Sequence, residues 1–200
     1  EFGMVYTREE LAALYATCQK YDLRLFIDGA RLGYGLVSAA CDYDLPFLAK
    51  HCDVFYIGGT KVGAMMGEAV VFSGMKAPKY FFTNVKRHGA LLAKGRMLGI
   101  QFDTLFTDEL YFKISRHAIA MATRIRSIFE KHGIAIAYDS PTNQQFVVLS
   151  PALYEALSQK VAFEIWERKS EHEIICRFVT SWATKEEELD ELDRILQAYA

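Results

Sequence analysis

The N-terminal part of the chain combines helical spacing of apolar residues with a short apolar run. Residues 7–10 (T-R-E-E) fit a capping box, in which the Thr7 hydroxyl and the Glu10 carboxylate satisfy free backbone N–H groups. Apolar residues then recur at helical spacing, which predicts a helix of about four turns. Residues 23–27 are a short apolar run that ends at Asp28, and a run of this length favours a buried strand over a helix.

The next segment repeats this alternation. A second helix is predicted over residues 44–51, with Pro46 in its first turn. Residues 54–57 form another short apolar run, which stops at two glycines, and residues 68–72 are a third candidate strand. Short apolar strands that alternate with helices predict a parallel α/β sheet.

The second half of the chain has a different pattern. Residues 75–132 are helical in pattern, and residues 108–131 predict one sustained amphipathic helix that Gly133 ends. Short apolar runs follow, with one helix starting near Pro151 and a last helix capped by Thr184. Strands are expected at residues 134–138, 145–149, 162–166 and 173–179. This part therefore reads as an α+β unit.

Composition and charge narrow the class of protein. The chain has 200 residues, of which 52% are hydrophobic and 24% charged, as in an ordinary globular protein. The change in pattern predicts a division into residues 1–105 and residues 106–200. A net charge of −2 gives no electrostatic case for nucleic acid or an anionic membrane as partner. No apolar stretch approaches the length that a membrane span needs.

The cysteines and histidines show no metal-binding pattern. The cysteines at positions 18, 41, 52 and 176 make no C-x-x-C pair and fit no zinc framework. They read as free thiols, and the start of the chain shows no secretory signal, so we expect a reducing cytoplasm. The five histidines likewise lack metal-ligand spacing, and no metal is expected.

Polar residues follow two of the predicted strands. Asp28 and Arg31 come directly after the first strand, and Lys61 follows the second behind Gly58 and Gly59. Ligands of open α/β sheets bind outside the carboxyl ends of the strands. Taken singly, Asp28 reads as a cap of the next helix, Arg31 and Lys61 as solvated side chains, and the glycines as a turn. Taken together at two strand ends of one sheet, they favour a ligand site.

These residue types suit an aldehyde cofactor. A lysine amine at such a place can condense with the aldehyde. An aspartate at the opposite edge of the cofactor would keep a pyridine nitrogen protonated, and the protonated ring is an electron sink for a carbanion at the substrate α-carbon. Glycines would let the backbone approach the cofactor closely.

Three segments of the chain resemble a known family. Residues 26–32 (F-I-D-G-A-R-L) resemble the D-G-A-R segment of the threonine aldolase and β-eliminating lyase family, which has the aspartate-aminotransferase (type I) fold of pyridoxal-phosphate (PLP) enzymes. Residues 56–61 (Y-I-G-G-T-K) resemble its Schiff-base segment, and residues 177–182 (R-F-V-T-S-W) its late R-x-V-T segment. The resemblance implies part of the large PLP-binding domain, residues 1–105, followed by the small α+β domain, residues 106–200.

The resemblance also implies roles for single residues. Asp28 would bind the pyridine nitrogen of pyridoxal 5'-phosphate, and Lys61 would be the catalytic lysine that carries it as a covalent aldimine. Arg31, close to the cofactor, and Arg177 would bind the substrate α-carboxylate, which suits the bidentate guanidinium. For Arg177 the alternative is a strand residue that faces water.

Two further residues are candidates for the cofactor phosphate. Thr60 could donate its hydroxyl there; the alternative is a turn hydroxyl bonded to the backbone. Arg96 lies where the family has a basic, glycine-containing helix start that reaches the phosphate, often from the neighbouring subunit.

The implied activity is that of a PLP-dependent aldehyde-lyase. It would cleave a β-hydroxy-α-amino acid, of the threonine or allo-threonine type, to glycine and an aldehyde. The alternatives are a β-eliminating lyase that gives pyruvate and ammonia, and a non-catalytic fragment or oligomerisation piece. The family has a long segment before D-G-A-R, so we expect an N-terminally truncated piece of a cytoplasmic homodimer or homotetramer. Such a piece would be inactive alone and would expose apolar surface.

Overall fold

The computed structural model describes residues 2–199, and their contacts divide them into two compact units. The first unit holds residues 6–114, and the second holds residues 115–199 together with residues 2–5. The division falls inside helix α6 (Leu110–Lys131). The domain boundary near residue 106 stays a prediction about the whole protein.

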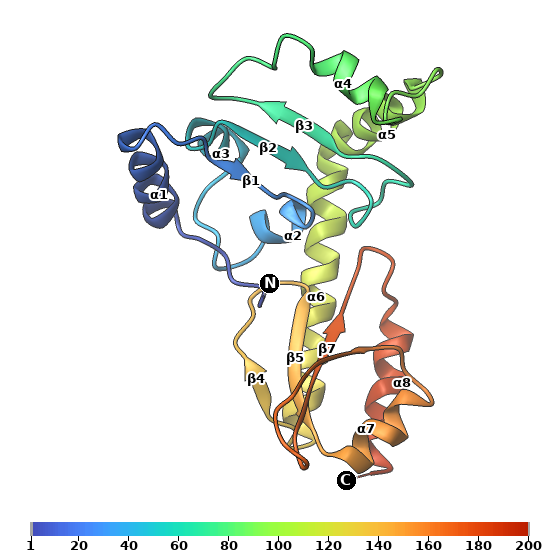
Figure 1. The fold of residues 1–200 in the computed structure, drawn as a ribbon. Helices are drawn as coiled ribbons and strands as arrows, with labels where there is room; N and C mark the ends of the chain where they lie inside the picture. Colours follow the sequence, from blue (N-terminus) through green and yellow to red (C-terminus); the bar gives the residue numbers. More distant parts are fainter. Residues whose placement is uncertain (1, 200) are drawn as a thin grey trace. The chain divides into compact units, whose positions relative to one another are not determined.

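The first unit is built on a three-stranded sheet in the order β1-β2-β3 (Figure 1). Its strands are β1 (Phe26–Ile27), β2 (Val54–Ile57) and β3 (Ala69–Phe72). β1 pairs with β2 in parallel, as predicted, but β3 pairs with β2 in antiparallel fashion. The sheet is therefore mixed. The link from β2 to β3 contains no helix, and a parallel pair needs a long crossover connection.

β1 is shorter than the predicted strand over residues 23–27. The backbone N–H of Leu25 donates to the buried Asp53 carboxylate at 2.8 Å, and the Leu25 carbonyl accepts from the Asp53 N–H at 3.0 Å. These bonds take the place of ladder pairing before Phe26, because an aspartate side chain has captured the donor that the strand would use. Leu23 is exposed.

Two of the five α-helices that lie wholly in the first unit, the first and the third, start at side-chain caps. The five are α1 (Arg8–Lys20), α2 (Leu32–Leu36), α3 (Leu45–Lys50), α4 (Phe81–Arg87) and α5 (Arg96–Phe106). The predicted capping box is confirmed, since Thr7 Oγ1 accepts from the Glu10 N–H at 3.3 Å and Glu10 Oε2 accepts from the Thr7 N–H at 2.8 Å. Asp44 caps α3, and Pro46 lies in its first turn as predicted.

One face of this sheet is covered by the helices. Leu11 of α1, Leu48 of α3 and Phe55 of β2 are buried in one apolar cluster. On the opposite face, Phe26 and Val70 are 57% and 49% exposed. The first unit thus carries an open apolar sheet face, as the sequence led us to expect.

The long helical region over residues 75–132 is broken into separate helices. α4 and α5 are followed by a short 3-10 turn (Thr107–Glu109) and then by α6. α6 begins at Leu110, later than predicted, because Asp108 and Glu109 have φ values of 49° and 57°, which a right-handed helix excludes. Gly133 follows its end with φ of 71°, as predicted.

The second unit is a four-stranded antiparallel sheet in the order β4-β5-β7-β6 with helices on it. Its strands are β4 (Ile136–Tyr138), β5 (Gln144–Leu149), β6 (Glu164–Arg168) and β7 (Ile174–Val179), all of them predicted within two residues. Two helices belong to this unit alone, α7 (Pro151–Ser158) and α8 (Glu186–Gln197). The predicted Thr184 cap is wrong: Lys185 is the N-cap residue, and the Thr184 hydroxyl accepts from the Ser181 N–H at 2.9 Å.

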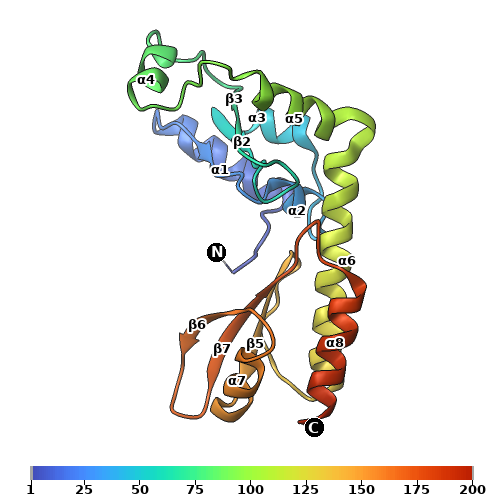
Figure 2. The ribbon, with the colours of Figure 1, turned by 90° about the vertical axis from the view of Figure 1, so that its right-hand side faces the viewer.

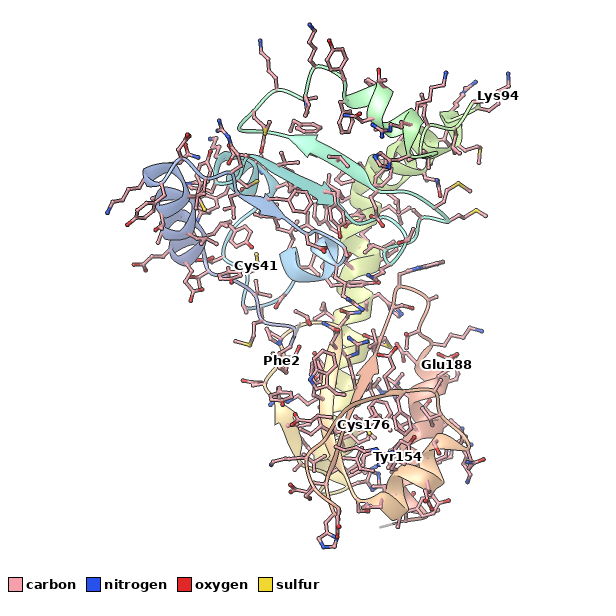
Figure 3. All side chains as sticks on the ribbon, viewed as in Figure 1. Phe2, Cys41, Lys94, Tyr154, Cys176 and Glu188 are labelled. Atoms are coloured by element: carbon pink, nitrogen blue, oxygen red, sulfur yellow. The ribbon has the colours of Figure 1, made fainter. Side chains whose placement is uncertain are left out.

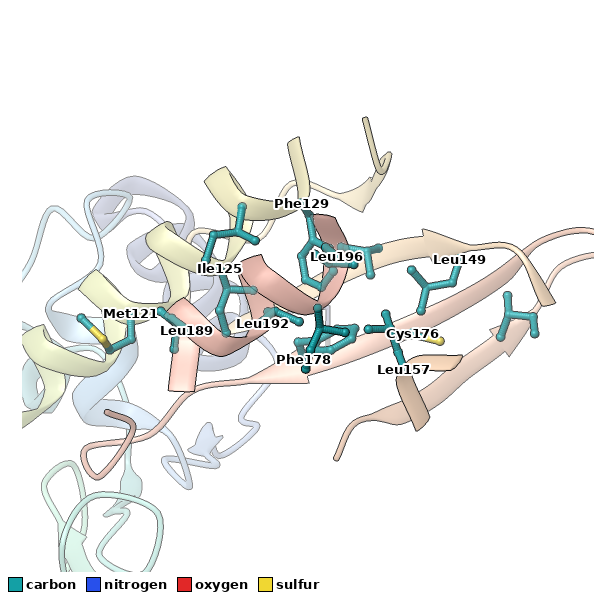
Figure 4. Close-up of a cluster of buried hydrophobic side chains, with 14 residues drawn as sticks. Met121, Ile125, Phe129, Leu149, Leu157, Cys176, Phe178, Leu189, Leu192 and Leu196 are labelled. Atoms are coloured by element: carbon teal, nitrogen blue, oxygen red, sulfur yellow. The ribbon is translucent and has the colours of Figure 1, made fainter. Parts of the chain in front are cut away.

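The two faces of the second sheet differ. Helices α6 and α8 lie side by side on one face (Figure 2), and their apolar side chains form the core with those of the sheet (Figure 4). The labelled members of this core are Met121, Ile125, Phe129, Leu149, Leu157, Cys176, Phe178, Leu189, Leu192 and Leu196. On the other face the Phe2 ring lies 4.6 Å from the Tyr138 ring and 5.5 Å from the Trp166 ring. This contact joins residues 2–5 to the second unit.

Two features are absent from residues 2–199. No helix there is both long and apolar enough to span a membrane. No group of three or more histidine, cysteine and acidic side chains there could hold a metal ion.

Candidate active site

Asp28 and Tyr56 meet at the carboxyl ends of β1 and β2. The parallel register pairs Phe26 with Val54 and the next residue of each strand with its neighbour, so Asp28 comes alongside Tyr56. The Tyr56 hydroxyl donates a hydrogen bond to Asp28 Oδ1, and the Ala30 N–H donates to the same oxygen at 3.0 Å. Asp28 therefore caps the turn before α2 but is not its N-cap, which is Arg31.

These bonds set the charge of the pair. The pKa of the Asp28 carboxyl is lowered, chiefly by the hydrogen bond from Tyr56 and next by the one from Ala30. Burial acts in the opposite direction, and the positive charges of Lys61 and Arg31 add to the lowering. Burial and the bond to Asp28 raise the pKa of Tyr56 to about 12. Near neutral pH Asp28 is thus a carboxylate, Tyr56 is its neutral donor, and two cations lie within electrostatic reach.

Glycines let the two strand ends touch. The Gly58 N–H donates to the Gly29 carbonyl at 2.9 Å. A Cβ added at Gly29 would lie 1.7 Å from the Tyr56 carbonyl oxygen, and one added at Gly58 would lie 2.4 Å from the Ala30 oxygen. Both approaches are to backbone atoms, so a side chain at either position would push the strand ends apart. The glycines thereby bring Asp28 and the Lys61 loop together.

The loop that carries Lys61 is held by side chains on both sides. The Glu68 carboxylate accepts from the Gly59 N–H at 2.5 Å and from the Thr60 hydroxyl at 3.0 Å. The Tyr34 hydroxyl donates to the Lys61 carbonyl. The Lys61 backbone is therefore fixed while its side chain is exposed. The Thr60 hydroxyl donates to a carboxylate and not to the backbone, and its role at the cofactor phosphate stays a prediction.

Tyr111 ties this loop to α2. Its hydroxyl donates to the Gly58 carbonyl at 2.9 Å and accepts from the Gly33 N–H at 3.1 Å. The side chain is fully buried, and burial raises the pKa of its phenol. A buried hydroxyl that both donates and accepts satisfies two backbone groups that would otherwise lack partners.

Arg31 and Arg96 lie in different surroundings. Arg31 is half-buried at the start of α2, where its charge acts on Asp28. Arg96 is the exposed first residue of α5, and no hydrogen bond or ion pair joins it to another residue in the range 2–199. The nearby Lys94 extends away from the chain (Figure 3). The structure thus groups Asp28, Arg31, Thr60 and Lys61, while the phosphate role of Arg96 stays a prediction.

Arg177 belongs to the second unit and sits in the middle of β7. Its Nη1 donates to Gln144 Oε1 at 2.9 Å, its Nη2 is ion-paired with Glu164, and its guanidinium lies 5.1 Å from the Trp166 ring centroid. Only 17% of the side chain is exposed, so Arg177 does not simply face water. Its Nε is buried and has no partner among residues 2–199. The carboxylate-binding role of Arg177 stays a prediction.

Sequence reasoning missed the side chains that hold the site, namely Tyr34, Tyr56, Glu68 and Tyr111. Tyr56 had a usable signal: a parallel pair that ends at Asp28 and Gly58 puts Tyr56 level with Asp28. Tyr111 had none, since 53 residues separate it from Gly58 along the chain.

Comparisons with known proteins identify the family of the chain. A family model described as "Beta-eliminating lyase" matches residues 1–152. A low specificity L-threonine aldolase from Pseudomonas sp. is 30% identical over 199 residues, which cover 99% of this chain and 57% of that protein. A solved threonine aldolase structure from Leishmania major has a TM-score of 0.95 at 37% identity, over 100% of this chain and 58% of that one.

More distant structures share the fold. A serine palmitoyltransferase from Sphingomonas wittichii has a TM-score of 0.64 at 12% identity, over 94% of this chain and 50% of that one. The common architecture is the type I fold of PLP-dependent enzymes, of which this chain forms a part. The chain belongs to the β-eliminating lyase family, and the resemblance drawn from its three motifs is confirmed. It spans a little over half the length of the relatives it matches.

Proposed function

We propose that the intact protein is a PLP-dependent lyase that cleaves a β-hydroxy-α-amino acid of the threonine type to glycine and an aldehyde. One observation carries the proposal: an ionised Asp28 and Lys61 lie within electrostatic reach of each other at adjacent strand ends. The names of the Pseudomonas and Leishmania relatives, both threonine aldolases, support the substrate class.

The donor set fits PLP. Asp28 Oδ1 accepts two hydrogen bonds, and its Oδ2 accepts none from residues 2–199. An open carboxylate oxygen with a lowered pKa is what a protonated pyridine nitrogen needs as partner. The exposed Lys61 side chain can reach an aldehyde from a loop whose backbone does not have to move. Arg96, at the start of α5, is a cation that would bind the phosphate.

Each residue then has one task. PLP, when bound, supplies the ring that accepts the electrons released as the substrate Cα–Cβ bond breaks. Lys61 Nζ would hold the cofactor covalently and yield it to the substrate amine. Asp28 would keep the proton on the pyridine nitrogen, and Arg31 with Arg177 would bind the α-carboxylate.

The phosphate is assigned to Arg96. In a homodimer or homotetramer, which we propose for the intact protein, Arg96 would reach the phosphate of a neighbouring subunit. The sequence also predicts Thr60 there; because its hydroxyl donates to Glu68, it would have to exchange that hydrogen bond for one to the phosphate. A cytoplasmic location is likewise a proposal from the sequence.

A second candidate is β-elimination to pyruvate and ammonia, which the family's description favours. It would use the same Lys61 and Asp28. Products separate the two: threonine cleaved to glycine and acetaldehyde supports the aldolase, and pyruvate from a substrate with a β-leaving group supports the elimination.

Borohydride reduction of the intact protein with PLP tests the site. We expect a phosphopyridoxyl mass on the Lys61 peptide, its loss in Lys61→Ala, and its retention in the matched control Lys94→Ala. Cleavage of threonine should fall to background in Lys61→Ala only. Label on another lysine, or cleavage that survives Lys61→Ala, would overturn the assignment.

A further inference from the structure

Besides the nearby cations of the site, the Asp28 carboxylate has a side-chain hydrogen-bond donor, the hydroxyl of Tyr56. Tyr56 projects from β2 at the level of Asp28, and its hydroxyl donates to Oδ1. The Tyr56 ring centroid lies 6.0 Å from that of Phe26, which precedes Asp28 on β1. The ring is therefore packed across the strand pair, and its hydroxyl is aimed by that packing.

We propose that Tyr56 is a positioning residue for Asp28, holding Oδ1 so that Oδ2 is the oxygen left for the cofactor's ring nitrogen. The proposal rests on the function proposed above. A carboxylate has two equivalent oxygens and rotates about its Cβ–Cγ bond. Two donors on one oxygen, the Tyr56 hydroxyl and the Ala30 N–H, remove this freedom. Hydrogen bonds to a charged acceptor are the strong ones, so the orientation is well defined.

The pair has fixed donor and acceptor roles. Asp28 is ionised and has no proton to give, and the pKa of Tyr56, about 12, keeps the phenol protonated across the physiological range. The hydrogen bond from Tyr56 is also the largest cause of the lowered pKa of Asp28. Without it, the Asp28 carboxyl would take up a proton at a higher pH and lose its hold on a protonated ring sooner on acidification.

The test is PLP binding by the intact protein as a function of pH, followed by absorbance, in wild type and Tyr56→Phe. We expect Tyr56→Phe to weaken PLP binding about 10-fold, the low end for a hydrogen bond to a charged group. The acid limb of the binding curve should move to higher pH, because the pKa of Asp28 rises. Tyr80→Phe, which removes an exposed phenol of the same unit, should change neither.

A double-mutant cycle separates positioning from general support of the fold. In an Asp28→Asn background, Tyr56→Phe should add little further loss, because Tyr56 acts through the carboxylate. Additive losses, or a wild-type acid limb in Tyr56→Phe, would sink the proposal. If Tyr56→Phe does not fold, Tyr56→Met keeps an apolar side chain of similar length without a donor, and its binding should be weaker than wild type with the same acid-limb shift; wild-type binding there would count against the proposal. A wild-type protein that does not bind PLP at Lys61 overturns the proposed function, and this proposal with it.

Discussion

Charged side chains are held in different ways in the two units. In the first, the Asp28 carboxylate accepts from a phenol and a peptide N–H, and the Glu68 carboxylate accepts from a peptide N–H and a hydroxyl. In the second, charge is met by opposite charge. The ion pairs there include Arg124 with Asp190, Arg126 with Asp139, Lys131 with Asp193, and Arg177 with Glu164.

Whether a charged group is held by neutral donors or by an opposite charge decides how readily a charged ligand can bind to it. A carboxylate held by neutral donors is oriented but keeps its full charge for a cationic partner. An ion-paired group is largely neutralised, so a charged ligand has to compete with the existing partner. In the roles proposed for them, Asp28 would offer its charge to a pyridinium without a competitor, whereas Arg177 would have to share its guanidinium between Glu164 and a substrate carboxylate. The pair Arg24 with Asp53 in the first unit follows the second pattern, and Asp53 serves the backbone of Leu25.

Arg177 offers the largest test of this contrast. If Arg177 has the role proposed for it, Arg177→Ala in the intact protein should raise KM for the proposed amino-acid substrate about 10- to 100-fold, the range for a lost hydrogen bond to a charged group. Glu164→Gln removes the competitor and leaves the guanidinium in place, so KM should stay the same or fall. Steady-state kinetics check both. An unchanged KM with a lower unfolding temperature in Arg177→Ala would make Arg177 a residue of the sheet alone.

Much of the fold was predictable because its signals are local. The capping box of Thr7 and Glu10 and the strand over residues 54–57 are written in a few adjacent residues. Features that depend on distant partners were not predictable. The antiparallel pairing of β3 and the late start of β1, where Asp53 binds Leu25, result from contacts across the sheet. The left-handed Asp108 sits in a segment whose apolar spacing is helical throughout.

The same division holds for the candidate site. Asp28 and Lys61 could be predicted because strand ends and glycines mark them in the sequence. The groups that hold them are not marked by such signals: Tyr111 is 78 residues from Gly33 along the chain, and Glu68 binds Gly59 from the other end of the connection between β2 and β3. A carboxylate beside Thr60 has no sequence pattern of its own. The candidate residues Asp28 and Lys61 can thus be found from the sequence, whereas the side chains that hold them cannot.

Tyr111 tests whether neutral donors hold the first unit's site. Tyr111→Phe leaves the Gly58 carbonyl and the Gly33 N–H without their buried partner, which should cost about 1–3 kcal/mol of unfolding free energy. Urea unfolding measures it. Tyr154→Phe is the matched control, because the Tyr154 hydroxyl makes no hydrogen bond with residues 2–199. Equal stability of both variants would mean that the hydroxyl does not fasten the loop.

Thr60 and Glu68 give a smaller and more local test. Thr60→Val should weaken PLP binding about 2- to 10-fold, as expected for a single lost hydrogen bond, by loosening the loop of Lys61. In a Glu68→Ala background the same change should have no effect, since its partner is gone. Thr104→Val, an exposed threonine on α5, serves as control. A Thr60→Val effect that persists without Glu68 would instead support the predicted role of Thr60 at the phosphate.

Replacing Asp193 should have the smallest effect on the free energy of unfolding, and the direction of its pH dependence follows directly from the pKa of this carboxyl. Hydrogen bonds from Lys131 and then His132 lower the pKa of its carboxyl below the unfolded value of about 3.9. A depressed folded-state pKa stabilises the fold above the unfolded pKa, and this contribution is lost as pH falls through the folded pKa. Asp193→Asn should therefore lower the urea midpoint slightly at pH 6, and its difference from wild type should shrink as the pH falls from about 4 through the lowered folded-state pKa.

The effect of salt on stability should differ between the Asp193 ion pair and the Asp28 site of the first unit. The Asp193→Asn difference should shrink in about 1 M salt, where the Debye length is about 3 Å, because its partners are charges. Glu171→Gln, an exposed acid with no ion pair to residues 2–199, should show no difference at either salt concentration. The destabilisation by Asp28→Asn should survive high salt, because a phenol and a peptide N–H hold that carboxylate. Equal salt sensitivity of the two aspartates would show that charge, not neutral donors, holds Asp28, and the contrast between the units would fail.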